Sequence, residues 1–286
     1  MAATTAKRGA RKRGAPAGRT SGSSSREAPR ALQANRPKIT VQPEVLQDFD
    51  ESTNILIHGN SGVGKTTLAG GAPNAVFLST EKGVVSAKRT GSNASLLRAF
   101  DWDHIVASLD WADENLGPEH WLILDSATKM QILQIRWILQ LIHEENENRD
   151  EDIPAIQDHQ KWQNMYMRFI DRIVDAKYNS IIITTSMIKD DQEGESIVMP
   201  AITGKDYTIS AYVCAQMSAV LYYGVAPSRH RDDPTVRRVL TETFPPYFAK
   251  NRYGDLFPRW LDVEEGDYTA MDRIIGCIQK DEEWSS

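Results

Sequence analysis

The sequence predicts an α/β fold with a mostly parallel central sheet, and two observations carry this prediction. Four short apolar runs have the length of strands, at 54–59, 74–80, 120–125 and 180–186. Their near-continuous apolar character is typical of parallel strands that helices cover on both faces. Between the runs, segments such as 160–177 repeat apolar residues at helical spacing. Strands that alternate with helices favour parallel neighbours joined by right-handed crossovers.

The chain opens with a basic segment of low complexity, residues 1–38. It holds ten Lys or Arg against one Asp or Glu, a charge of +9, while the other 248 residues hold 23 against 38, a charge of −15. Its apolar surface is too small to offset the entropy of ordering, so we expect a disordered tail. Clustered cations favour contact with nucleic-acid phosphates, and the alternative is a tail that only aids solubility.

The middle of the chain predicts two long helices, at 126–143 and 160–177. The second carries an apolar stripe that should face the core, formed by Trp162, Met165, Tyr166, Phe169, Ile170 and Ile173. The acidic stretch between the helices, 143–160, is expected to be a surface loop. A second hydrophilic stretch, 189–206, directly follows a strand.

The C-terminal part of the chain predicts further strands, expected to be antiparallel, and one closing helix. The strands are expected at 218–226, 236–243 and 246–250, and the helix at about 268–279.

Cysteine content and hydropathy favour a protein of the cytoplasm without a membrane partner. The two cysteines, Cys214 and Cys277, form no metal-ligand spacing, and two buried thiols are favoured over a disulfide. No apolar run approaches membrane-spanning length. The basic start of the chain is followed by no hydrophobic stretch, which excludes a secretory signal.

The strongest motif is "GNSGVGKT" at 59–66, which matches G-x-x-x-x-G-K-[ST] in full. Gly59, Gly62 and Gly64 let the backbone turn tightly and point several N–H groups inward as an anion-binding nest. A strand pattern precedes the motif and a helical pattern follows it, as a phosphate-binding loop requires. The expected nucleotide-binding residues are Gly59, Asn60, Ser61, Gly62, Val63, Gly64, Lys65, Thr66 and Thr67.

The motif and a second acid together predict binding of ATP with Mg²⁺. Lys65 places a cation on the β and γ phosphates, and the Thr66 hydroxyl is suited to ligate the metal. "WLILDS" at 121–126 places Asp125 at the carboxyl end of a buried strand, where it would hold Mg²⁺ with Thr66. The alternative for Asp125 is a helix cap.

A glutamate completes a recognisable order of elements. "VFLSTEKG" at 76–83 places Glu81 at the carboxyl end of a strand, where ligands gather in open α/β sheets. Taken alone, Glu81 is better explained as an ordinary exposed turn residue. The order of these strands resembles the RecA-type ATPase core. The strand before the phosphate loop comes first, followed by a strand that ends in a glutamate, a strand that ends in Asp-Ser and a strand that ends in small polar residues. The resemblance covers about 53–254.

Within that core the chain looks closest to the phage-encoded RecA-like ATPases of the Sak group, which are single-strand annealing or recombination-mediator proteins. The resemblance implies a RecA-like ATPase domain over 39–286, in which Glu81 activates the attacking water. "IVMPAITGKD" at 197–206 is similar to a P-x-x-x-G-K element of phage members. In RecA proteins the loop at this place contacts DNA, which would be about 188–206 here, with Lys189 and Lys205 on phosphates.

The stretch "FAKNRYGD" at 248–255 extends the resemblance. "KNRYG" is similar to the K-N-K of RecA and the K-N-R-F-G of RadA-type proteins, in which such cations reach the γ phosphate on a neighbouring subunit. Lys250 and Arg252 are two apart and would project to one face of an extended segment. The resemblance therefore implies active sites shared within a homo-oligomer, a ring or a filament. The alternative is a solvated strand end with two cations.

One departure concerns the fourth core strand. RecA ends it with Asn-Gln, whose Gln senses the γ phosphate, whereas this chain has Thr184, Thr185 and Ser186. Thr185 or Ser186 would have to take that role.

The preferred function is therefore ATP-dependent DNA recombination on single-stranded DNA, by annealing or strand exchange, in the host cytoplasm if the chain is phage-encoded. A cognate single-strand-binding protein is an expected partner. Two alternatives stay open, a nucleotide-stabilised annealing scaffold with little hydrolysis and a hexameric helicase-type motor. A small-molecule kinase is least favoured, because the body shows no Arg-rich lid.

Overall fold

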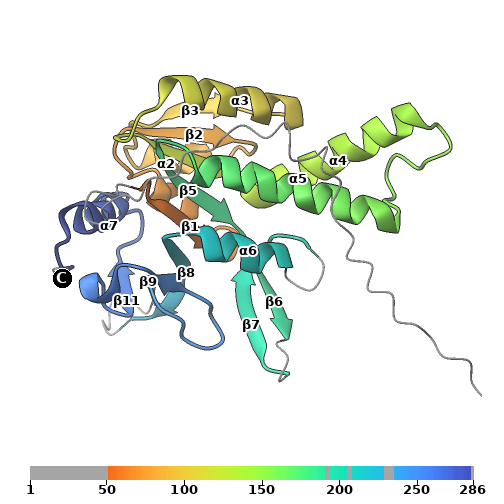
Figure 1. Cartoon of the computed structure of the whole chain (residues 1–286). Coiled ribbons are helices and arrows are strands. Elements are labelled where there is room, and N and C mark those ends of the chain that lie inside the picture. The colour runs from red at the N-terminus through yellow and green to blue at the C-terminus, as the bar shows by residue number, and fades with distance from the viewer. Residues whose placement is uncertain (1–50, 191–193, 205–207, 229–234, 285–286) are drawn as a thin grey trace, which may run out of the picture. The chain divides into compact units, whose positions relative to one another are not determined.

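A single large sheet organises the residues that the computed structural model describes, which are 51–190, 194–204, 208–228 and 235–284. Nine strands of these described residues form it. They are β1 (Asn54–His58), β2 (Ala75–Ser79), β3 (Ser95–Arg98), β4 (Trp121–Asp125), β5 (Asn179–Thr184), β8 (Ala219–Pro227), β9 (Thr235–Leu240), β10 (Lys250–Asn251) and β11 (Trp260–Val263). Their order is β11-β9-β8-β1-β5-β4-β2-β3, and β10 pairs with β8. Figure 1 labels all strands of this order except β4.

The sheet is parallel from β8 to β3 and antiparallel toward the C-terminal side, which confirms the predicted fold class. Both β9 and β10 pair with β8 in the antiparallel sense, and β11 pairs with β9 in the same sense. Strand β8 lies where the two parts of the sheet meet, since it runs parallel to β1 and antiparallel to β9 and β10. Because the parallel strands share one direction, their carboxyl ends lie along one edge of the sheet.

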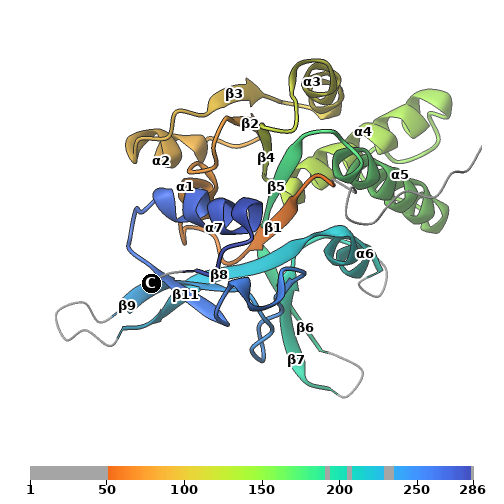
Figure 2. The same cartoon turned by 60° about the vertical axis from the view of Figure 1, so that its left-hand side comes forward.

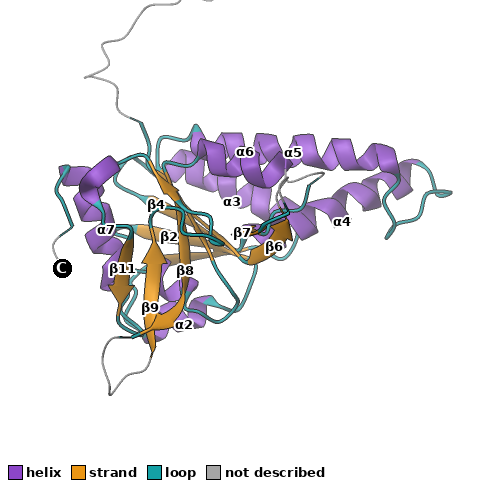
Figure 3. Cartoon of the chain, turned by 90° about the horizontal axis from the view of Figure 1, so that it is seen from below, coloured by secondary structure: helices purple, strands orange, loops and turns teal. Residues whose placement is uncertain are grey.

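Seven helices of the described residues cover the two faces of the sheet, which explains the apolar strands. They are α1 (Lys65–Ala69), α2 (Val84–Arg89), α3 (Trp102–Asn115), α4 (Ala127–Glu145), α5 (Ile156–Val174), α6 (Thr208–Gln216) and α7 (Thr269–Lys280). One hydrophobic cluster takes its helical residues from α1, α2 and α7, and the other takes them from α3, α4, α5 and α6. Figures 2 and 3 show the second group gathered on one side of the strands. None of the described helices is long and apolar enough to cross a membrane.

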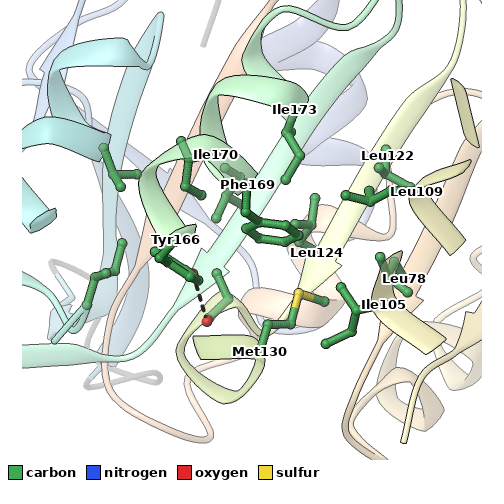
Figure 4. Packing of buried hydrophobic residues seen from close by; sticks show 14 of the residues in the cluster. Leu78, Ile105, Leu109, Leu122, Leu124, Met130, Tyr166, Phe169, Ile170 and Ile173 are labelled. Carbon is green, nitrogen blue, oxygen red and sulfur yellow. Dashed lines mark hydrogen bonds between the residues drawn. The ribbon is translucent and has the colours of Figure 1, made fainter. Parts of the chain in front are cut away.

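The predicted apolar stripe of α5 lies against the sheet (Figure 4). Five of its six residues are buried, and Met165 is half-buried. The Tyr166 hydroxyl donates a hydrogen bond to the Ala127 main-chain oxygen at 2.9 Å, which ties α5 to the first turn of α4. This contact orients α4, whose first residue directly follows the "WLILDS" segment.

The stretch 189–206 holds a β-hairpin where the sequence suggested only a loop. In it β6 (Ser186–Asp190) pairs antiparallel with β7 (Ser196–Pro200), and the two strands project away from the sheet (Figures 1 and 2). In the sequence, charged residues and Gly194 between the two segments interrupt the hydrophobic pattern, which hid two short strands from a search for apolar runs.

Other boundaries differ from the prediction by a turn or more. The loop expected over 143–160 is shorter, because α4 extends to Glu145 and α5 begins at Ile156. The strand expected at 246–250 is the two-residue β10. The helix α3 was not predicted, although Asp101 caps its start by accepting a hydrogen bond from the His104 main-chain nitrogen at 2.8 Å.

Candidate nucleotide-binding site

The carboxyl ends of four neighbouring parallel strands bring the predicted site residues to one edge of the sheet. In the order β1-β5-β4-β2, His58 lies beside Thr184, and Asp125 lies between Ile183 and Ser79. The phosphate loop directly follows β1, and Glu81 follows β2 by two residues. The sequence pattern therefore places the loop, the acid and the glutamate side by side because all their strands run in one direction.

The glycines of the loop are required by its geometry. At Gly59, an added Cβ would lie 2.0 Å from the Tyr223 main-chain oxygen, so no larger residue fits between the loop and β8. Gly62 and Gly64 have φ angles of 81° and 99°, in the left-handed region that side chains disfavour. Asn60, together with Ser61 and Gly62, is exposed at the tip. The loop then opens directly into α1.

Lys65 is buried inside the loop, and its ammonium group is held by the loop's own backbone. Nζ donates hydrogen bonds to the main-chain oxygens of Gly59 and Asn60, each at 2.8 Å. Burial lowers the pKa of Lys65, while the negative charges of Asp125 and Glu81 raise it in partial compensation. The cation is thus positioned beside the loop where phosphate oxygens would bind.

Thr66 and Asp125 are brought together across 59 residues of sequence. The Thr66 hydroxyl donates a hydrogen bond to Asp125 Oδ2 at 3.0 Å. Burial raises the pKa of Asp125 to about 6, and the charge of Glu81 adds to this, whereas the Thr66 hydrogen bond and Lys65 oppose it. A hydroxyl and a carboxylate oxygen are hard ligands of the kind that Mg²⁺ prefers, so the pair fits the predicted metal.

Glu81 is oriented by its neighbours although it is exposed. The Ser126 hydroxyl donates a hydrogen bond to Glu81 Oε1 at 2.8 Å. The turn that carries Glu81 is closed by Ser79, whose hydroxyl donates to the Glu81 main-chain oxygen at 2.9 Å. Ser126 was not among the predicted residues, and its only signal was its position directly after Asp125.

The structure does not bring Lys250 and Arg252 to the phosphate loop of their own chain. In β10, Lys250 lies beside Val220 near the start of β8, and the Arg252 main-chain nitrogen donates to the Ser218 oxygen just before that strand, whereas the loop follows the opposite, carboxyl end of β1. Both cations donate to the Ala215 main-chain oxygen near the end of α6, Lys250 at 3.2 Å and Arg252 at 2.8 Å. They point the same way, as their spacing predicted, toward the amino-terminal edge of the strands.

Thr184 and the two candidate phosphate sensors that follow it, Thr185 and Ser186, occupy distinct positions. Thr184 is fully buried, and its hydroxyl has no hydrogen-bond partner within the described part of the chain. The Thr185 main-chain nitrogen donates to the Thr128 hydroxyl at 3.3 Å. The Ser186 hydroxyl contacts the imidazole of His58, a residue that the sequence analysis did not single out.

The proposed DNA contacts are only partly within the described residues. Lys189 lies on β6 of the hairpin. Lys205 and the basic segment 1–38 lie outside the described residues.

Comparison with protein-family models matches residues 51–253 to the family described as AAA domain. This match spans well over half of the chain. The chain belongs to this AAA domain family. Membership makes the protein a P-loop ATPase of the AAA type and implies nucleotide binding, usually with Mg²⁺. A search of the curated proteins gave no match. The AAA domain includes the loop, Glu81 and Asp125, and also Lys250 and Arg252, which lie away from the loop.

Proposed function

We propose that this AAA domain protein is a RecA-like ATPase of the phage Sak type that acts on single-stranded DNA in recombination, by annealing or strand exchange. The observation that carries the proposal is that two sets of candidate site residues lie at opposite edges of the sheet in one subunit. Lys65, Thr66, Glu81 and Asp125 gather at the carboxyl edge of the sheet, while Lys250 and Arg252 lie at its amino edge.

The carboxyl-edge cluster supplies the groups that ATP hydrolysis needs. Glu81 accepts a proton from a water molecule as the water oxygen attacks the γ phosphorus, and the bond to the β–γ bridging oxygen breaks. Lys65 exchanges its loop carbonyls for phosphate oxygens. Thr66 and Asp125 would hold Mg²⁺, whose charge stabilises the phosphate oxygens. Ser126 keeps the Glu81 carboxylate beside Asp125 through its 2.8 Å hydrogen bond.

The amino-edge cations fit a site completed by a second copy of the chain. They are directed away from their own loop, so they meet a bound nucleotide only when another subunit places its carboxyl edge against them. Such a contact uses two different surfaces and builds a ring if it closes or a filament if it does not. Arg252 suits the transferring phosphoryl group because its guanidinium is rigid and always charged.

Contact with single-stranded DNA is proposed for the β6–β7 hairpin and the basic segment 1–38. The hairpin leaves the sheet directly after β5, at the same edge as the nucleotide site, so DNA and nucleotide would act on adjacent elements. The body of the chain is acidic, so DNA contacts must concentrate in these two parts. A single-strand-binding protein is the expected partner on the same DNA.

The test is ATP hydrolysis by the full chain, with and without single-stranded DNA, over a range of protein concentrations. Lys65→Ala should abolish hydrolysis, and Arg252→Ala should reduce turnover while it spares nucleotide binding. Arg259→Ala, which removes an exposed arginine paired with Glu242, is the matched control and should behave like the unmodified protein.

A mixture of the Lys65→Ala and Arg252→Ala proteins tests directly whether active sites are shared between subunits. In an equal mixture, about a quarter of the interfaces pair an intact loop with an intact Arg252, so turnover should recover to that order. Normal turnover by Arg252→Ala alone would remove the shared site. Hydrolysis that ignores both DNA and protein concentration would favour a nucleotide-stabilised scaffold instead.

The DNA contribution is tested by deletion of residues 1–38 and by salt. The deleted protein should bind single-stranded DNA more weakly and with a shallower dependence on salt, because fewer phosphate counterions are released. Unchanged affinity would exclude a role for this segment.

A further inference from the structure

A buried imidazole joins three elements that the proposed function requires to act together. His58 is the last residue of β1 and directly precedes the phosphate loop, and it is fully buried. Its Nδ1 lies 2.9 Å from the Ser186 hydroxyl, at the base of hairpin β6–β7. Its Nε2 lies 2.7 Å from the Phe248 main-chain oxygen, two residues before Lys250.

The chemistry of the two partners fixes the state of the ring. A carbonyl oxygen only accepts, so Nε2 carries the hydrogen and donates it to Phe248. Nδ1 is therefore the acceptor, and the Ser186 hydroxyl donates to it. Burial is the main reason that the pKa of His58 falls to about 4; the hydrogen bond to Phe248 opposes this shift and the nearby Lys65 charge adds to it, so the ring is neutral at pH 7. Both ring nitrogens are thus satisfied by groups from distant parts of the chain.

The hairpin and the segment before Lys250 are themselves bonded to each other. The Val198 main-chain nitrogen donates to the Pro246 oxygen at 2.8 Å, and the Phe248 nitrogen donates to the Val198 oxygen at 2.9 Å. Tyr247 stacks on Tyr222 at 4.2 Å between ring centroids, and Tyr222 meets the His58 ring edge-on at 5.3 Å. The hairpin and residues 246–248 therefore form one packed assembly, and His58 links it to the strand that carries the loop.

We propose that His58 is a positioning residue that couples the nucleotide loop to the hairpin and to the cation pair. This proposal rests on the proposed function, because it assigns to His58 the communication between nucleotide and DNA sites. When a nucleotide binds and changes the arrangement of the loop and Lys65, it also moves His58, because His58 directly precedes Gly59. Since His58 is bonded at both nitrogens, a shift of β1's end reaches Ser186 and Phe248 through two short hydrogen bonds.

A purely structural histidine would also be buried and satisfied, so the test needs a readout other than stability. A fluorescent probe on the hairpin reports its response to nucleotide without requiring hydrolysis or DNA. Ile188, which is 72 % exposed on β6, provides the site as Ile188→Cys in a Cys277→Ser background. The remaining cysteine, Cys214, is buried, and burial raises the pKa of its thiol to about 12, so it stays unlabelled.

Four variants of the labelled full chain distinguish loss of the His58 hydrogen bonds from a general loss of stability. Ser186→Ala removes the hydroxyl that donates to Nδ1, and His58→Phe removes both ring nitrogens. His58→Asn restores an acceptor near the Nδ1 position. Ser196→Ala is the matched control, because it removes a hydroxyl from the same hairpin whose bond goes only to Asp190, at 3.1 Å.

The measurement is the change in fluorescence on adding a non-hydrolysable ATP analogue with Mg²⁺, together with the analogue's Kd. The unmodified protein, His58→Asn and Ser196→Ala should respond, whereas Ser186→Ala and His58→Phe should lose about fivefold or more of the response. The Kd should change by less than about threefold, since none of these side chains belongs to the loop 59–66 or to the pair of Thr66 and Asp125.

An unmodified protein whose hairpin ignores the analogue, or a Ser186→Ala protein that responds normally, overturns the proposal. If His58→Phe does not fold, Ser186→Ala with its Ser196→Ala control still decides the matter. The readout also stands apart from the proposed function. A hairpin that responds to nucleotide in a protein whose hydrolysis ignores DNA would retain the coupling and reject the DNA role.

Discussion

Replacement of Asp125 by Asn is expected to stabilise the nucleotide-free protein while it removes a ligand for Mg²⁺. The side chain is only 3 % exposed at the end of β4, and burial is the main reason that its pKa rises from 3.8 to about 6. Glu81 adds to the shift, and the Thr66 hydrogen bond and Lys65 do not fully offset it. The charged form is therefore a cost to the folded state.

The size of that cost follows from the two pKa values. The folded protein binds the Asp125 proton more tightly than the unfolded chain, so stability is lost as pH rises above the unfolded pKa of 3.8 and the loss is complete above about 6. At 1.36 kcal/mol for each unit, the cost is about 3 kcal/mol at pH 8 and about half of that at pH 5. Asn carries no charge and keeps an oxygen for the Thr66 hydroxyl.

The assay is urea unfolding of both proteins without nucleotide or Mg²⁺, at pH 8 and pH 5. Asp125→Asn should exceed the unmodified protein in free energy of unfolding by about 3 kcal/mol at pH 8 and by about half as much at pH 5. Asp255→Asn, which alters an exposed carboxylate, is the control and should change stability little. A gain that does not depend on pH, or a loss at pH 8, would refute the reasoning.

Three further predictions address the same region and the core. Gly59→Ala should abolish ATP binding and destabilise the fold by about 1–3 kcal/mol or more in urea unfolding, since its Cβ would lie 2.0 Å from a main-chain oxygen of β8. Its control is Gly276→Ala in α7, where an added Cβ meets nothing within 4 Å and the change should be neutral or stabilising. Tyr166→Phe should cost about 1 kcal/mol in urea unfolding, because a buried carbonyl of α4 loses its 2.9 Å donor, and no loss would show that water replaces the hydroxyl. The affinity for Mg²⁺ in the presence of nucleotide should fall about tenfold for each pH unit below about 6, as the Asp125 carboxylate takes up its proton, and a flat titration would exclude Asp125 from the metal site.

The nucleotide site was predictable because each of its parts leaves a local signal. The loop needs glycine at fixed positions, and the positive φ angles of Gly62 and Gly64 show why. Asp125 and Glu81 were found from their places after apolar strands, since parallel strands end along one edge. The hydrogen bond from Ser126 to Glu81 left no such signal, because it depends on how two strands are placed side by side.

The missed elements share a different cause. The helix α6 is "TISAYVCAQ", which has too few charged residues to show a polar face, so its pattern does not distinguish it from a strand or loop. This helix directly precedes β8 and belongs to the crossover by which that strand enters the sheet parallel to β1. His58 could not be recognised from sequence, since Ser186 and Phe248 lie 128 and 190 residues away.

The carbonyl oxygen of Ala215 adds an energetic cost to the binding of a phosphate by Lys250 and Arg252, because both cations donate hydrogen bonds to it. It belongs to the last turn of α6, where main-chain oxygens have no partner within the helix, and it accepts from both Lys250 and Arg252. A phosphate that attracts either cation must replace a bond worth about 1 kcal/mol and leave the end of the helix less well neutralised. In a subunit on its own, both cations therefore stay bonded to the Ala215 oxygen. The exchange becomes favourable only when an anion lies within reach of Lys250 and Arg252.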